Sequence, residues 1–222
     1  MVQRVVEAVR VPVTVKMRLG WDATTLTAPA FAREFEKVGV AAVTIHGRTR
    51  ECGFSGQVEY DTIREVKRSV RLPVAANGDI DSPEKALGVL ERTGADAVMI
   101  GRAAQGRPWI FREVHHYLDR GERLPPPCVE EIRALIVEHL GDHYALYGEE
   151  TGVKTARKHL GWYARGLAGG EAFRNEVNRL ETAAAQLAAV DRFFDRLADR
   201  GERLAYAEAP AQASWEEEAL AA

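Results

Sequence analysis

The chain has 222 residues, of which 46% are hydrophobic and 28% charged, and its formal net charge is −3. This composition is typical of a folded protein, and the slightly acidic balance argues against a generally basic nucleic-acid-binding coat. No apolar stretch reaches the roughly 18 residues that a membrane span requires. The N-terminus carries charges where a signal peptide needs an unbroken apolar run, so we expect a cytoplasmic protein without membrane contact.

The cysteine content bounds the chemistry further. Cys52 and Cys128 are too few for a disulfide framework or a four-cysteine zinc site. His46 has no Asp or Glu at metal-ligand spacing. We therefore predict no metal site and a reducing compartment.

Residues 11–111 repeat one pattern four times: a short β-branched run, a polar turn and a helical stretch. The runs that we predict to be strands are Val13–Leu19, Ala41–His46, Pro73–Asn77 and Ala97–Gly101. The helices that we predict around them are Val2–Val9, Thr27–Val38, Asp61–Ser69 and Pro83–Thr93. Strands that alternate with helices indicate an α/β fold with a parallel sheet.

Four βα units are half of a TIM (β/α)8 barrel, and the chain starts in a helix that leads straight into a strand. We therefore expect residues 1–124 to form the C-terminal half of such a barrel. Its open sheet edges predict pairing with a missing N-terminal half-barrel, or self-association.

The strand pattern stops after residue 109, and helical periodicity takes over. The helices predicted there are Trp109–Leu118, Val129–Tyr147, Val153–Leu167, Glu171–Leu180 and Ala183–Arg200. The proline run at 125–127 marks a domain boundary. We expect an all-α helical domain over 125–204 and a flexible tail over 205–222.

Each predicted strand ends in residues that can carry chemistry. These residues are Lys16 and Arg18, His46, Asn77-Gly78-Asp79 and Gly101-Arg102. Ligands of α/β folds bind beyond the carboxyl ends of the strands, and the last barrel loops commonly hold a phosphate, which Arg102 can contact. The alternatives are a structural ion pair for Lys16, a core residue for His46 and a simple turn at 77–79.

A basic segment interrupts the acidic chain. Residues 151–180 contain six Lys or Arg and two Glu, a surplus of four positive charges. One helix face can carry Lys154, Arg157, Lys158 and Arg165, and we expect these side chains to have no acidic partners four residues away. His159, Trp162 and Tyr163 interleave with them, and such a mixture suits RNA binding. The alternatives are a solvated helix face, and a core position for Trp162.

Five stretches in unbroken order resemble the tRNA-dihydrouridine synthase family, most closely its bacterial B-type branch. They are VPVTVKMRLGWD, TIHGRTRECGFSG, PVAANGDI, TGADAVMIGRAAQGRPWIF and ARKHLGWY. The resemblance implies an FMN-binding TIM barrel followed by a helical tRNA-binding domain. It also implies that NADPH reduces the flavin and that a uridine flipped out of the tRNA is reduced to 5,6-dihydrouridine.

The resemblance assigns roles to individual residues. The FMN contacts that it implies are Lys16, His46, Asn77, Gly78, Asp79, Gly101 and Arg102, with the last pair at the phosphate. The RNA contacts that we expect are Arg48, Arg50, Lys154, Arg157, Lys158 and Arg165.

One departure from the family is large. The family's catalytic cysteine belongs to an Asn-x-Gly-Cys-Pro motif, which this sequence lacks, as it lacks the first flavin loop. Neither Cys52 nor Cys128 fits that motif, so we assign no catalytic residue and expect no activity from the chain alone. The alternatives are a non-catalytic tRNA-binding remnant and another FMN-dependent barrel oxidoreductase, against which ARKHLGWY argues.

Overall fold

The computed structural model describes residues 1–206, which fall into two compact units. Among the described residues, the first unit comprises Met1–Ala104 and Trp109–Arg123, and the second comprises Gln105–Pro108 and residues 124–206. None of the helices within 1–206 combines the length and the apolar character that crossing a membrane requires. Of the tail expected at 205–222, residues 207–222 lie outside the described part of the chain.

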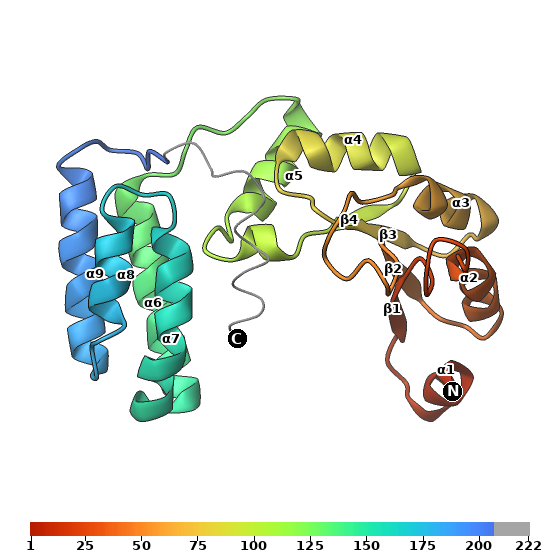
Figure 1. Cartoon of the computed structure of the whole chain (residues 1–222), viewed down its shortest axis with the longest axis horizontal. Coiled ribbons are helices and arrows are strands. Elements are labelled where there is room, and N and C mark those ends of the chain that lie inside the picture. Colours follow the sequence, from red (N-terminus) through yellow and green to blue (C-terminus); the bar gives the residue numbers. More distant parts are fainter. Residues whose placement is uncertain (207–222) are drawn as a thin grey trace. The chain divides into compact units, whose positions relative to one another are not determined.

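The first unit is built on a parallel sheet with the strand order β1-β2-β3-β4. Its strands are β1 (Thr14–Arg18), β2 (Ala42–His46), β3 (Val74–Asn77) and β4 (Ala97–Met99). Its helices are α1 (Val2–Ala8), α2 (Ala28–Lys37), α3 (Asp61–Ser69), α4 (Pro83–Thr93) and α5 (Ile110–Arg120), with a short 3-10 turn η1 (Arg102–Ala104) after β4. Helices α2, α3 and α4 lie along one side of the sheet (Figure 1). The α/β pattern predicted from the sequence is confirmed.

The core lies between the sheet and these helices. Val43, Ile45 and Val74 alternate with less buried residues along their strands and are fully buried. Ile63 and Val66 of α3, three residues apart, are buried in the same cluster. The period of two in the strands and the period of about 3.6 in the helix therefore bury one apolar face each.

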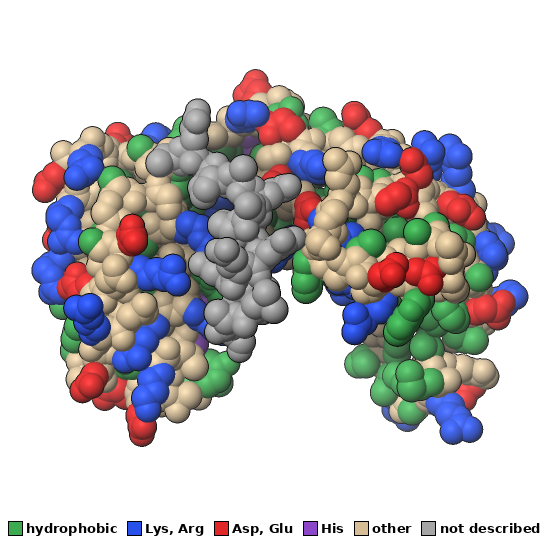
Figure 2. Space-filling model, in the orientation of Figure 1, with side chains coloured by type: hydrophobic (Ala, Val, Ile, Leu, Met, Phe, Trp, Pro, Cys, Tyr) green, Lys and Arg blue, Asp and Glu red, His purple; other side chains and the backbone are tan. Residues whose placement is uncertain are grey.

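Strand β1 forms one edge of the sheet. Val15 and Met17 pack against the core but stay partly exposed, and Lys16 between them is exposed, as the alternation predicts. Figure 2 shows hydrophobic side chains near this end of the unit, where Val5 is 46% and Val11 is 68% exposed. An unpaired strand with exposed apolar neighbours is suited to further strand pairing.

The second unit is helical in its described part. Its helices are α6 (Val129–Tyr147), α7 (Glu149–Ala164), α8 (Gly170–Val177) and α9 (Ala183–Ala198). The prediction placed the start of α7 at Val153, four residues late. Gly148, with φ +73°, is the only break between α6 and α7, and Glu149 and Glu150 favour a helix N-terminus electrostatically.

Candidate functional site

The ends of the four strands bring the predicted residues together at one edge of the sheet. In the strand register, Arg18 pairs with His46 and His46 pairs with Asn77. Asn77 in turn pairs with Met99, to whose carbonyl its Nδ2 donates a hydrogen bond of 2.8 Å. A parallel sheet thus converts four separate sequence motifs into one row of side chains.

Asp79 ties two of the loops at this edge together. Its carboxylate accepts from both terminal nitrogens of Arg48, at 2.5 and 3.1 Å, and from Nη2 of Arg102 at 3.0 Å. These guanidinium groups hold the pKa of Asp79 below its usual range against the opposing effect of burial. Asp79 has a φ of +44°, a left-handed conformation that a short polar residue tolerates.

Arg48 differs from its predicted role. The residue is only 4% exposed, and besides Asp79 its guanidinium binds the carbonyl oxygens of Ser55 and Gly56. A buried group with these partners organises the loop after β2. The RNA contact that we expected of Arg48 stays a prediction, and it would require the loop to release this guanidinium, whereas Arg50 is exposed.

The same loop presents an aromatic ring that the sequence analysis missed. Phe54 is 56% exposed, and its ring centre lies 5.3 Å from Cζ of Arg18 and 5.5 Å from Cζ of Arg102. Arg18 also binds the carbonyl oxygens of Thr49 and Gly53, at 2.8 and 2.6 Å. The signal was available, because Arg18 shares the strand face of Lys16 and Phe54 stands in a glycine-flanked loop.

His46 is a neutral imidazole at neutral pH. Burial, followed by the positive charges of Arg18 and Lys16, lowers its pKa to about 4. Gly78 packs against it, since a Cβ there would lie 3.2 Å from the His46 ring and 2.7 Å from Val58. A neutral imidazole can donate or accept a hydrogen bond without adding charge to a site that is already cationic.

Positive charge is left over at this edge. Lys16 is exposed and has no hydrogen-bond or ion-pair partner among residues 1–206. Arg102 donates one N–H of Nη2 to Asp79, which leaves the other N–H donors of its guanidinium for an anion such as a phosphate. Gly101 is exposed, with open space where a side chain would be. The residues present therefore fit a ligand with a phosphate and an electron-rich ring.

The two cysteines lie in loops, and Cys52 belongs to the loop that contacts Arg18 at the end of β1. Cys52 is exposed in the loop after β2, where hydrogen bonds with Thr49 lower the pKa of its thiol. Cys128 precedes α6 in the second unit. Neither residue terminates a strand of the sheet.

The basic residues of α7 are more engaged than the sequence suggested. Lys154 forms an ion pair of 2.9 Å with Glu150, so the expectation of no acidic partner four residues away is wrong for it. Arg157 donates to the carbonyl of Leu180 at 2.9 Å and is half-buried, which makes it a brace between α7 and the end of α8. Lys158 is exposed, with Nζ 5.8 Å above the ring of Trp162.

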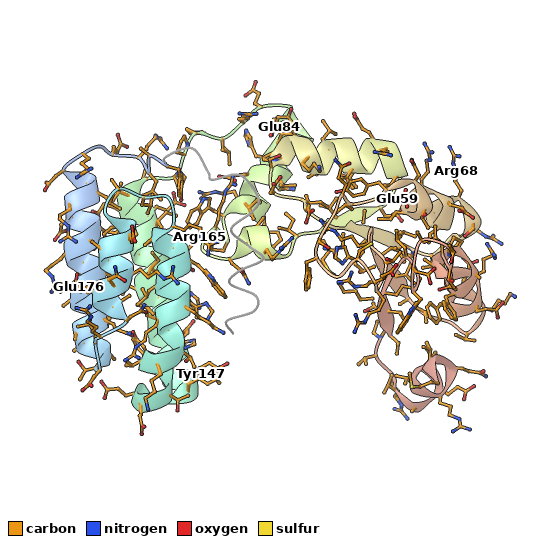
Figure 3. All side chains as sticks on the ribbon, viewed as in Figure 1. Glu59, Arg68, Glu84, Tyr147, Arg165 and Glu176 are labelled. Carbon is orange, nitrogen blue, oxygen red and sulfur yellow. The ribbon has the colours of Figure 1, made fainter. Side chains whose placement is uncertain are left out.

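Trp162 and Arg165 complete this surface. Trp162 is half-buried, so its ring is not a fully enclosed core residue as the alternative interpretation held. Arg165 directly follows the last residue of α7. Figure 3 labels Arg165 and Tyr147, which mark the two ends of α7, and Figure 2 shows many Lys and Arg side chains over the visible face of this unit.

Comparison with known proteins identifies the family to which this sequence belongs. A family model described as dihydrouridine synthase matches residues 1–198. The chain belongs to the dihydrouridine synthase family. It is 51% identical over 197 residues to tRNA-dihydrouridine synthase B of Pseudomonas aeruginosa. The proteins of the same name from Xanthomonas axonopodis and Shewanella oneidensis are 54% and 52% identical.

The match covers the relatives unequally. The alignments take in 87–89% of this chain but only 58–60% of each of these three relatives. The chain thus spans about three fifths of the length of the dihydrouridine synthases that it matches. All the strand ends described above lie within the matched residues.

Proposed function

We propose that this chain supplies the flavin-binding edge and the RNA-binding helices of an FMN- and NADPH-dependent tRNA-dihydrouridine synthase. The observation that carries the proposal is the row of Arg18, His46 and Asn77 at the strand ends, with Lys16 unpaired beside it. We further propose that the sheet is the C-terminal half of a TIM barrel over residues 1–124. The helical domain over 125–204 would bind tRNA in the cytoplasm.

The residues divide the work of holding FMN by their chemistry. Arg102 would bind the phosphate through the guanidinium N–H groups that Asp79 does not use, and Asp79 would fix its orientation. Lys16 would place a positive charge beside the ring system, while His46 and Asn77 offer neutral hydrogen-bonding groups. When bound, the reduced flavin would supply a hydride to uridine, which together with a proton saturates the C5–C6 bond. NADPH would then reduce the flavin again.

Asp79 supports this division, although it alters one expectation. Both of its carboxylate oxygens are occupied by Arg48 and Arg102. Direct contact with FMN, which the resemblance implies for Asp79, would compete with these ion pairs. We therefore assign Asp79 to positioning Arg102, and leave Gly78 and Gly101 as the places where the backbone comes close to the ligand.

Catalysis requires more than these residues. The printed sequence contains no Asn-x-Gly-Cys-Pro motif, and β1 and β4 each lack a second neighbouring strand in the described sheet. We propose that a further half-barrel segment pairs with these strands and brings the proton donor to C5 of the uridine. A second candidate function, a non-catalytic tRNA-binding remnant, is favoured by the absent motif alone.

A chimera tests the proposal. The part of the Pseudomonas aeruginosa relative that this chain does not cover would be fused to it, and the protein titrated with FMN. We expect stoichiometric FMN binding and loss of flavin absorbance on adding NADPH under anaerobic conditions. The same fusion carrying Lys16→Gln is the matched control and should bind FMN more weakly. A soluble chimera that retains no FMN contradicts the flavin assignment and favours the remnant.

A further inference from the structure

Three histidines form a cluster on the facing surfaces of α6 and α7, outside the sheet site. The ring centres of His139 and His143 are each close to that of His159, at 5.2 and 5.3 Å, and lie 6.1 Å from each other. All three residues are half-buried. No group of three His, Cys, Asp or Glu side chains within residues 1–206 has the arrangement of a metal site, so this cluster needs another explanation.

The hydrogen bonds leave one of the three imidazoles available. Thr155 donates its hydroxyl proton to the carbonyl of Thr151 at 2.8 Å, so Nε2 of His143 must be the donor in its 2.7 Å contact with Thr155 Oγ1. Nδ1 of His139 lies 3.0 Å from the hydroxyl of Tyr163. His159 has no hydrogen-bond partner in the described part of the chain.

Aromatic rings extend the cluster in both directions. The ring of Tyr147, which is 52% exposed, lies 4.7 Å from that of His143. The ring of Trp162 lies 5.0 Å from that of His159, and Lys158 stands above Trp162. We call Tyr147, His143, His159 and Trp162 the imidazole strip. These rings pack edge-on or tilted against one another, so the strip offers ring edges with their nitrogen atoms, and a cation at one end, to the charged backbone of a nucleic-acid strand.

The electrostatics of the strip oppose charge in the free protein. The pKa of His159 is lowered to about 4, mainly by burial and then by the charges of His139, Lys158 and His143. Burial also lowers the pKa of His143. No carboxylate contributes to either shift.

The neighbouring helices add no compensating negative charge either. Helix α8 presents Arg174 to α7 at Gly161, and α9 presents the uncharged Gln186 to Tyr144. Glu138 and Asp142 of α6 are exposed and contribute to neither shift, so an anion placed against the strip would supply the negative charge that these shifts lack.

We propose that the imidazole strip contacts the sugar-phosphate backbone of the tRNA and that His159 takes up a proton from solvent when it does so. The proton adds to a ring nitrogen that has no protein partner, and the imidazolium then donates to a phosphate oxygen. This inference rests on the proposed tRNA-binding function. A negative charge within about 4–6 Å of an imidazole raises the pKa of that imidazole by about 1–3 units. The bound His159 would therefore titrate near neutrality instead of far below it.

Linkage gives the expected size of the effect. If binding raises the pKa of His159 from about 4 to roughly 6–6.5, the affinity for RNA should increase about four- to tenfold between pH 7.5 and pH 5.5. The sign is fixed, because only the bound state holds the extra proton in this range.

The test is a titration of the full chain with unmodified tRNA transcript at constant ionic strength from pH 7.5 to pH 5.5. We expect tightening on acidification, and proton uptake seen by calorimetry in two buffers of different ionisation enthalpy. His159→Gln should flatten the pH dependence. His116→Gln, on α5 and outside the strip, is the matched control and should keep it.

The outcomes separate this inference from the function on which it rests. Binding of tRNA with the same affinity at both pH values, or without proton uptake, overturns the role of His159 and leaves the proposed tRNA binding intact. Absence of tRNA binding at every pH overturns both. The calorimetric measurement uses the unaltered protein, so the inference does not depend on whether the variant folds.

Discussion

Asp79 and Arg48 form the most enclosed ion pair described above, with side chains 17% and 4% exposed. Because removing one partner strands the other charge in a buried place, we expect Asp79→Asn to lower the free energy of unfolding by about 3 kcal/mol. Asn tolerates the left-handed backbone, so the loss reports the charge. Asp61→Asn, whose exposed pair with Arg92 is solvent-screened, is the control and should cost far less in the same urea titration. Equal losses would contradict the account.

Arg102 tests the phosphate assignment at the same scale. In a form of the protein that binds FMN, we expect Arg102→Ala to weaken FMN binding by about 1.5–3 kcal/mol, the range for a hydrogen bond to a charged group. Riboflavin, which has no phosphate, should bind the variant and the parent alike. Unchanged FMN affinity would remove Arg102 from the phosphate site.

His46 predicts a pH dependence of stability. Its pKa is about 4 in the folded chain and near 6.5 in an unfolded one, so the unfolded state binds the proton more readily. The stability that this residue contributes is complete above pH 6.5 and is lost as pH falls towards 4. We expect His46→Gln to make the urea midpoint of unfolding depend less on pH between pH 6.5 and pH 4. His159 titrates in the same direction, so the comparison is made in a His159→Gln background. An unchanged slope would contradict the burial of His46.

At the scale of elements, the sequence predicted what local periodicity and capping determine. All four strands followed from the short β-branched runs, and the helices between them from apolar residues at helical spacing. Ser82 caps α4 by accepting a hydrogen bond from Lys85 N at 3.2 Å. The start of α7 was missed because Glu149 and Glu150 give no apolar period, although Gly148 marks the break. The burial of Arg48 could not be predicted, because its partner Asp79 lies 31 residues away and meets it only when β2 and β3 pair.

Helix α7 carries the prediction for RNA binding. Lys158 is exposed and has no ion-pair partner among residues 1–206, so its charge is available to a phosphate. We expect Lys158→Ala to weaken binding of all tRNA sequences alike and to reduce the salt slope of log K by about one. Lys37→Ala, an exposed lysine of α2 paired with Glu34, is the matched control and should leave the slope unchanged. A slope that does not move for Lys158→Ala would make this helix face merely solvated.

At the scale of the whole molecule, we propose that the chain is one part of a dihydrouridine synthase. Loss of a general acid alone costs about 10²–10⁴ in rate, and a flavin held from one half of its site adds to that loss. The exposed apolar side chains near β1 also predict that the isolated chain self-associates. Sedimentation of the purified chain would show this as oligomers that disappear in the chimera.

The most direct measurement is the dihydrouridine content of tRNA after incubation with FMN and NADPH. The 222-residue chain would be compared with its fusion to the uncovered part of the Pseudomonas aeruginosa relative. We expect the fusion to form dihydrouridine and the chain alone to form none above background. If the chain alone forms dihydrouridine at the rate of the fusion, the need for a second half is wrong, and Cys52 becomes the first residue to mutate.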